Sequence, residues 1–272
     1  MVLFPNAKIN VGLHVGPRRE DGYHDLWTVF WPVQWCDILE ITPAAADETT
    51  LTVTGRAVDC AMTDNLVYKA WHLMHERFQV PNVDINLHKI IPDKAGLGGG
   101  SSDAAFMLKG LNEMFGLGLS KPELAEIAVE LGADCPFFIY NEPLAATGKG
   151  EIFAPLPSEP LPFPASDCQI AIVKPNVNIS TKLAFADLDN DRVGRSPDLW
   201  VNHFEAVIAD RHPEVAETIR KLNDLGALYV SLSGSGSAVY AIFDGDVKGL
   251  PETVAELFPG MDTYCAPFPA KL

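Results

Sequence analysis

Residues 92–105 read PDKAGLGGGSSDAA, which places four glycines within five positions and follows them with two serines and an aspartate. The preceding stretch 82–91, NVDINLHKII, alternates apolar and polar side chains as a half-buried strand does. After the glycines, apolar side chains recur at helical spacing over 104–115. The region therefore predicts a strand, a glycine loop and a helix in that order.

The glycine loop has the chemistry of a phosphate site. Glycines let the backbone take positive φ and approach a ligand closely, and the free N–H groups of a helix N-terminus attract phosphate. A flexible linker is disfavoured because the loop is set tightly between a strand and a helix, while a purely structural tight turn stays open. The Walker A lysine, the dinucleotide-binding glycine spacing and the HRD and DFG motifs of protein kinases are all missing from the sequence.

Composition narrows the function classes. The 272 residues are 47% hydrophobic, enough for one large or two smaller cores, and 20 Lys+Arg stand against 36 Asp+Glu for a net charge of -16. That charge argues against nucleic acid or a membrane surface as a partner. The five scattered cysteines include no CxxC pair, and neither a secretory leader nor a membrane-spanning run is evident. We expect a cytoplasmic protein with free thiols, a monomer or weak homodimer.

The chain divides at a proline-rich segment. PLPSEPLPFP at 155–164 contains five prolines, which exclude helix and central strand and indicate a linker. Helices are predicted before it at 64–78 and 121–131, the latter with an S-x-x-E capping box, and a strand and a helix after it at 168–175 and 213–226. The sequence thus predicts an α+β protein with two domains, 1–154 and 155–272.

Several motifs resemble those of the GHMP kinases. The glycine loop resembles their second motif, P-x-x-x-G-L-G-S-S, and SLSGSGSAVYAIF at 231–243 resembles the third. AKIN and DGYH within 7–33 resemble the first, while LGADCPFF at 131–138 and KPNVNISTKLAF at 174–185 are similar to two further segments. Because the motifs occur in the family's order, the resemblance covers nearly the whole chain. It departs from the pattern at Asp93, Lys94, Ser237 and Tyr240, none of which touches the expected chemistry.

The resemblance implies a fold and a reaction. The implied fold is the two-domain GHMP kinase fold, with an N-terminal ATP-binding domain like ribosomal protein S5 domain 2 and a ferredoxin-like C-terminal domain. The implied reaction moves the γ-phosphoryl of ATP onto a hydroxyl. The form of the loop with three consecutive glycines before SSDAA resembles that of one branch of the family. The acceptor implied by that branch is a cytidine-diphosphate-linked polyol of non-mevalonate isoprenoid biosynthesis.

Two alternatives stay open. The first is another GHMP kinase, acting on mevalonate, homoserine or a sugar. The second is a non-catalytic RNA-binding module on an S5-like fold. Mg²⁺ is expected to arrive with ATP, because no His/Cys/Asp cluster has metal-ligand spacing and no metal site is predicted.

The resemblance assigns two catalytic residues. Asp134 in LGAD is implied to be the general base, and Lys8 in AKIN its electrostatic partner. From the residues alone, Asp134 could equally cap a turn and Lys8 could be an ordinary surface lysine. Asn10 shares a strand face with Lys8 and is implied to orient the acceptor.

Other residues are implied to bind the two substrates. Tyr23, His24 and Phe185 form the expected nucleobase site, and Thr181 is expected at the diphosphate; without the resemblance these are ordinary core or surface residues. Asn65, which is equally a helix cap, and Lys89 are the expected adenosine contacts. Ser102 is implied to touch Mg²⁺ or the β-phosphate. The remaining expected ATP contacts are Pro92, Asp93, Lys94, Ala95, Gly96, Leu97, Gly98, Gly99, Gly100 and Ser101.

Overall fold

The computed structural model describes residues 1–44, 47–164, 166–190 and 196–268. The chain forms two compact units, each built from separate segments. Unit 1 comprises Met1–Ala7, Gln34–Asp93 and Gly98–Glu142, and unit 2 comprises Lys8–Val33, Lys94–Leu97 and Pro143–Leu272. The units group residues by their contacts and combine segments that are far apart in the sequence. The predicted domain boundary instead divides the chain once, after residue 154. The units therefore do not test this boundary, which stays a prediction.

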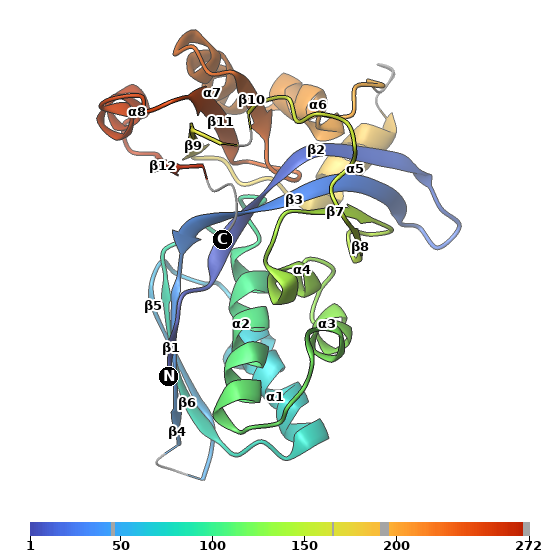
Figure 1. Ribbon diagram of the computed structural model, residues 1–272, viewed down its shortest axis with the longest axis vertical. Coiled ribbons are helices and arrows are strands. Elements are labelled where there is room, and N and C mark those ends of the chain that lie inside the picture. Colours follow the sequence, from blue (N-terminus) through green and yellow to red (C-terminus); the bar gives the residue numbers. More distant parts are fainter. Residues whose placement is uncertain (45–46, 165, 191–195, 269–272) are drawn as a thin grey trace. The chain divides into compact units, whose positions relative to one another are not determined.

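Unit 1 contains a four-stranded sheet with two long helices against it (Figure 1). In β6 the side chains of Val83, Ile85 and Leu87 are buried, which confirms the predicted alternation. As predicted, a helix follows the strand and the glycine loop; α2 begins at Gly99, so the last two glycines lie in its first turn, and it packs on β4. The sheet order is β1 (Val2–Leu3), β4 (Ile38–Pro43), β6 (Val83–Lys89) and β5 (Thr50–Gly55), and the helices are α1 (Leu66–Phe78) and α2 (Gly99–Met114).

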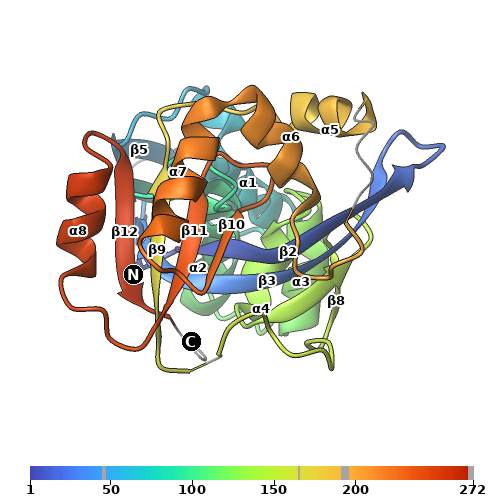
Figure 2. The ribbon, with the colours of Figure 1, turned by 90° about the horizontal axis from the view of Figure 1, so that it is seen from above.

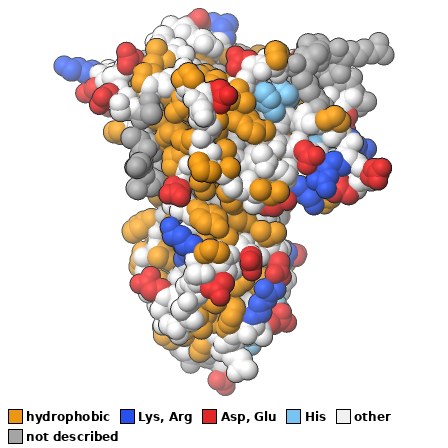
Figure 3. Space-filling view, turned by 45° about the vertical axis from the view of Figure 1, so that its right-hand side comes forward, with side chains coloured by type: hydrophobic (Ala, Val, Ile, Leu, Met, Phe, Trp, Pro, Cys, Tyr) orange, Lys and Arg blue, Asp and Glu red, His pale blue; other side chains and the backbone are white. Residues whose placement is uncertain are grey.

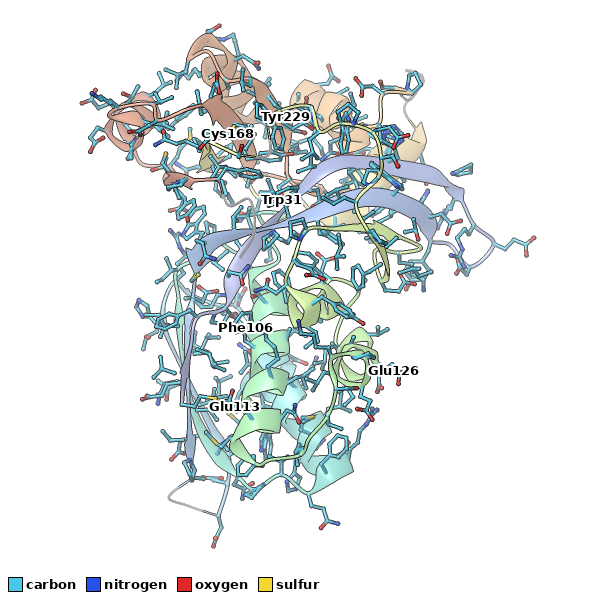
Figure 4. All side chains as sticks on the ribbon, in the orientation of Figure 1. Trp31, Phe106, Glu113, Glu126, Cys168 and Tyr229 are labelled. Atoms are coloured by element: carbon cyan, nitrogen blue, oxygen red, sulfur yellow. The ribbon has the colours of Figure 1, made fainter. Side chains whose placement is uncertain are left out.

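Three short helices complete unit 1. In α3 the predicted capping box is present, with the Ser120 side chain accepting from the Glu123 N–H and a Glu123 oxygen accepting from the Ser120 N–H at 2.8 Å. Figure 4 labels Glu126 on the exposed face of this helix. The sequence did not predict α4, which follows Asp134 and has Pro136 in its first turn. The bounds are η1 (Met62–Asp64), α3 (Lys121–Val129) and α4 (Cys135–Tyr140).

Most of the first sheet of unit 2 consists of two long strands. Ile9, Val11 and Leu13 of the AKIN strand are buried, as their alternation predicts. Trp31 on the neighbouring strand, labelled in Figure 4, is also buried and stacks on Phe268. The order is β2 (Asn6–Arg18), β3 (His24–Cys36), β7 (Leu144–Thr147) and β8 (Ile152–Ala154).

The second sheet of unit 2 is fully antiparallel and has the ferredoxin-like β-α-β-β-α-β succession. Helices α7 and α8 pack against it (Figure 2), and their Val215 and Val254 join a core with Val173, Ala241 and Phe243 of the strands. The strand order is β10 (Tyr229–Leu232), β11 (Val239–Asp244), β9 (Cys168–Lys174) and β12 (Asp262–Pro267). The helices are α5 (Thr181–Asn190), α6 (His203–Arg211), α7 (Pro213–Asp224) and α8 (Leu250–Leu257).

The predicted linker at 155–164 contains neither helix nor strand. Its one buried aromatic, Phe163, packs on Tyr229. All five cysteines are free thiols, as predicted. Among the residues described, no helix combines the length and apolarity that a membrane crossing needs.

Candidate active site

Lys8 is buried on β2 and bonded to the glycine loop within unit 2. Its side chain is 3% exposed, and Nζ donates to Asn10 Oδ1 at 2.7 Å and to the Gly96 carbonyl at 2.9 Å. The Lys8 backbone N–H also donates to the Leu97 carbonyl at 2.9 Å. The surface-lysine alternative is therefore wrong, because this ammonium is held at a defined position beside the loop.

Asn10 is fixed from three directions. Its side-chain Oδ1 accepts from Lys8, and its Nδ2 donates to Thr28 Oγ1 at 2.9 Å. Its backbone carbonyl accepts from the Tyr240 hydroxyl at 2.8 Å. Thr28 donates onward to the Gly12 carbonyl at 2.6 Å. The sequence did not identify Thr28, and Tyr240 stood out only as a departure from the third motif. The two side-chain bonds set the orientation of the Asn10 amide.

The third-motif turn at 233–237 lies against the glycine loop within unit 2. Gly96 has φ of +77°, and a Cβ there would fall 2.0 Å from the Ser233 carbonyl oxygen, so only glycine fits. Ser233 Oγ donates to the Gly96 carbonyl at 2.9 Å. A Cβ on Gly234 would meet the Gly96 Cα at 3.3 Å. The second and third motifs are therefore in direct contact.

The start of α2, in unit 1, has polar groups without a capping partner. Gly98 occupies the N-cap position and supplies no capping side chain. Ser102 is fully buried, and its Oγ finds no hydrogen-bond partner in the described part of the chain. Because buried polar groups are normally bonded, this hydroxyl and the first-turn N–H groups fit a phosphate of ATP. Of the other loop residues, Asp93, Lys94 and Gly100 are exposed, while Pro92, Ala95 and Leu97 are buried.

Lys89 is paired with two buried carboxylates in unit 1. Its Nζ donates to Asp103 Oδ2 at 2.6 Å and to Asp37 Oδ2, while Asp37 Oδ1 accepts from the N–H groups of Ile90 and Ile91. Burial opposes the charged ammonium, but the two carboxylates outweigh it and raise the pKa of Lys89. Burial also raises the pKa of Asp103 to about 7 against the opposing effect of Lys89. The adenosine contact of Lys89 stays a prediction.

Asn65 is a helix cap. Its Oδ1 accepts from the Val67 N–H at 3.0 Å at the start of α1. The capping alternative is therefore correct, and the adenosine contact remains a prediction beside it.

Asp134 lies immediately before α4, and its side chain makes no capping hydrogen bond to that helix. The turn-capping alternative and the catalytic role of Asp134 both stay predictions. The helix that follows is tied to α2 by Lys109, whose Nζ donates to the Phe138 carbonyl at 3.0 Å. Burial lowers the pKa of Lys109 to about 8.

His24 and Phe185 are in direct contact in unit 2. Their rings stack with centroids 5.1 Å apart and planes 19° apart. His24 Nδ1 lies 2.9 Å from the Gly16 carbonyl, and Nε2 lies 3.4 Å from an Asp189 carboxylate oxygen. Since a carbonyl only accepts, Nδ1 carries a hydrogen. The structure thus brings together two of the three predicted nucleobase residues.

Tyr23 is 57% exposed, and the Lys149 ammonium lies 4.0 Å from its ring centroid. The Lys149 turn is anchored to β3 by the Leu26 N–H, which donates to the Gly148 carbonyl at 2.7 Å. Sequence reasoning missed Lys149, since nothing in its neighbourhood indicates a ring contact. The nucleobase contact of Tyr23 stays a prediction.

Thr181 begins α5, and its Oγ1 lies 3.1 Å from Ser235 Oγ in the third-motif turn. Ser237 of the same turn donates to the Val177 carbonyl at 2.7 Å. The two motifs that contribute Thr181 and the serines are therefore joined directly.

Comparison with known proteins defines the family. The model of the GHMP kinases N terminal domain matches residues 65–142, and the GHMP kinases C terminal model matches residues 184–260. The chain belongs to the GHMP kinase family. A 4-diphosphocytidyl-2-C-methyl-D-erythritol kinase of Bacteroides thetaiotaomicron is 45% identical over 267 residues, which cover 93% of this chain and 95% of the relative. One of the same name from Geobacillus thermodenitrificans is 32% identical over 95% of this chain and 92% of its own length.

Solved structures agree with this placement. A crystal structure of 4-(cytidine 5'-diphospho)-2C-methyl-D-erythritol kinase aligns with a TM-score of 0.80 at 31% identity, covering 97% of this chain and 98% of that one. The Methanococcus jannaschii mevalonate kinase aligns with a TM-score of 0.69 at 14% identity over 99% of this GHMP kinase and 98% of that chain, which shows a shared fold alone. The predicted family and two-domain fold are confirmed.

Acidic and basic side chains are interspersed on the described surface that Figure 3 presents, without a broad basic area. This distribution is consistent with the net charge of -16. Any phosphate site must therefore be built locally, from backbone N–H groups and a few side chains.

Proposed function

We propose that this GHMP kinase transfers the γ-phosphoryl of ATP to the 2-hydroxyl of 4-diphosphocytidyl-2-C-methyl-D-erythritol in non-mevalonate isoprenoid precursor biosynthesis. Relatives with this kinase name are 32–45% identical over most of the chain. The observation that carries the chemistry is the buried Lys8 ammonium, bonded to the glycine-loop carbonyl of Gly96. An RNA-binding module would need neither this buried cation nor the acidic composition.

We assign the triphosphate of ATP to the glycine loop. The N–H groups at the start of α2 and the unpartnered Ser102 hydroxyl would bind phosphate oxygens. Bound with ATP, Mg²⁺ supplies neutralising charge across the transferring group. Among the described residues no group of three or more His, Cys, Asp and Glu is placed to hold a metal, so ATP would carry the ion.

We assign the proton transfer to Asp134. Its carboxylate would accept the proton of the 2-hydroxyl as the hydroxyl oxygen attacks the γ-phosphorus and the bond to the β-γ bridging oxygen breaks. General bases of this kind contribute about 10²–10⁴-fold. Lys8 would stabilise the negative charge that develops, and Asn10, whose amide is already oriented, would position the acceptor.

The acceptor's nucleobase would be bound by the aromatic group at Tyr23, His24 and Phe185. Tyr23 presents an exposed ring for stacking, and His24 has a polar edge beside its stacked partner Phe185. Thr181 would contact the diphosphate. Mevalonate, homoserine and a simple sugar have no base to stack, so this group favours the cytidyl acceptor over theirs.

Replacement of Asp134 tests the reaction. Wild-type protein with MgATP and the cytidyl acceptor should release ADP and give a product heavier by one phosphoryl group, detected by mass spectrometry. Asp134→Asn should lower kcat by about 10²–10⁴-fold with an unchanged melting temperature. Asp210→Asn on the exposed face of α6 is the matched control and should retain wild-type kcat. Wild-type kcat in Asp134→Asn would contradict the base, and no product from wild-type protein would contradict the reaction.

A further inference from the structure

Asn202 uses every polar atom of its side chain. It is 1% exposed and immediately precedes α6 in unit 2. Its Nδ2 donates to the Leu232 carbonyl at 2.7 Å and to the Gly234 carbonyl at 2.8 Å, and its Oδ1 accepts from the Phe204 N–H at 2.9 Å. Two donors and one acceptor on a single planar group are what a primary amide offers.

Helix capping explains only one of these bonds. Serine or aspartate would cap α6 as well as asparagine does. The segment before α6 is also held without the side chain, because the Leu13 N–H donates to the Val201 carbonyl at 3.2 Å. The two Nδ2 bonds of Asn202 therefore serve the third-motif turn, not the helix.

The two carbonyls that Asn202 holds lie on either side of Ser233. Ser233 Oγ donates to the Gly96 carbonyl at 2.9 Å, and the same carbonyl oxygen accepts from Lys8 Nζ at 2.9 Å. A carbonyl oxygen has two lone pairs, so both donors can bind at once. A continuous series of contacts thus runs from Asn202 through Ser233 and Gly96 to Lys8.

We propose that Asn202 is a positioning residue for the kinase reaction. By fixing the backbone on both sides of Ser233, it sets the direction of the Ser233 hydroxyl. That hydroxyl in turn positions the Gly96 carbonyl, to which the ammonium of Lys8 is bonded. This inference rests on the role of Lys8 given above. It adds a residue from outside the recognised motifs to the group that determines where the charge of Lys8 lies.

Asn202→Asp isolates the donor function. Aspartate keeps the capping oxygen but replaces the Nδ2 donors with an anionic oxygen facing two carbonyl oxygens, so the turn must shift. A displacement of about 1 Å at a catalytic group can cost about 100-fold. We therefore expect kcat to fall about 10- to 100-fold. KM for the cytidyl acceptor should change less than kcat, because Tyr23, His24 and Phe185 are untouched.

A double-mutant cycle with Ser233→Ala tests the route. If Asn202 acts through Ser233, the kcat of the double variant should be no lower than that of the less active single variant. If the two substitutions act independently, their fold-reductions in kcat should multiply. Asn112→Asp on α2 is the matched control. Asn112 also donates its Nδ2 to a backbone carbonyl, that of Leu119, at 3.0 Å, but lies outside the series. The Asn112→Asp variant should have a lower melting temperature than wild type and an unchanged kcat.

The outcomes separate this inference from the proposed function. Wild-type kcat in Asn202→Asp, or multiplicative effects in the cycle, would overturn the positioning role. Wild-type kcat in Lys8→Met would instead contradict the proposed role of Lys8 itself. Should Asn202→Asp fail to fold, Asn202→Ser, which keeps a capping oxygen and one donor, carries the same expectation of reduced kcat.

Discussion

The ammonium of Lys8 donates to the Gly96 carbonyl oxygen at 2.9 Å, and the Lys8 backbone N–H donates to the next carbonyl, that of Leu97, at the same distance. A residue of the first motif is thus joined twice to the loop of the second, 88 positions along the chain. The Lys8 charge is positioned by the protein itself. Such preorganised charge is effective because it need not be reoriented during the reaction.

Removing this charge should abolish most of the catalysis. Lys8→Met retains an apolar stem and loses the ammonium, so we expect kcat to fall by about 100-fold or more in steady-state ADP-release assays. Lys248→Met, at an exposed position of unit 2, is the control for loss of one positive charge. A kcat of Lys8→Met close to that of the control would contradict the assignment.

The contact between Gly96 and Ser233 predicts a position-specific glycine effect. Gly96→Ala would place a Cβ 2.0 Å from the Ser233 carbonyl oxygen, while Gly116→Ala, also at positive φ, would meet nothing within 4 Å. The control should lose only about 1–2 kcal/mol of unfolding free energy from its backbone conformation. Gly96→Ala should lose more and also raise KM for ATP. Equal urea midpoints for the two variants would show that the close approach has no energetic consequence.

The exposed ring of Tyr23 predicts a selective effect on the acceptor. Tyr23→Ala should raise KM for the cytidyl acceptor about 5- to 150-fold, equivalent to about 1–3 kcal/mol for one stacked base, and leave KM for ATP unchanged. Phe4→Ala removes another aromatic ring of similar exposure from unit 1 and should change neither constant. A parallel rise in both KM values for Tyr23→Ala would indicate a general disturbance instead of base stacking.

The buried Asp103 predicts a pH dependence of stability. Its folded pKa of about 7 lies above the ordinary value of 3.8, so between these values the folded protein holds a proton that the unfolded chain has released. The contribution to stability is therefore present at low pH and is lost as pH rises toward 7, by at most about 1.4 kcal/mol per pH unit.

Comparison with Asp103→Asn isolates this contribution. The amide cannot titrate, so the difference in unfolding free energy between wild type and variant should shrink or reverse as pH rises from 4 to 7, measured by urea denaturation. A difference independent of pH would show that Asp103 is ionised throughout that range.

The sequence predicted those parts of the fold that depend on local patterns. The capping box at Ser120 and the alternation of β6 specify their elements through neighbouring residues, and both are present. Helix α4, by contrast, has six residues, too few for a helical period to be recognised. Motif resemblance identified Lys8, which composition alone would place at the surface.

The supporting contacts could not be predicted in this way, because they join residues distant in sequence. Asn202 and Leu232 are 30 positions apart, and Ser233 and Gly96 are 137 apart. Lys89 likewise finds Asp37 at a separation of 52. Their chemistry is ordinary hydrogen bonding, and only the folded backbone decides which donors meet which acceptors.

The most direct test is the specificity constant for ADP release with MgATP and four acceptors in parallel: 4-diphosphocytidyl-2-C-methyl-D-erythritol, mevalonate, homoserine and galactose. The account predicts turnover with the cytidyl acceptor and none above background with the other three. Comparable or greater turnover with a small acceptor, or none with the cytidyl acceptor from folded protein, would contradict it.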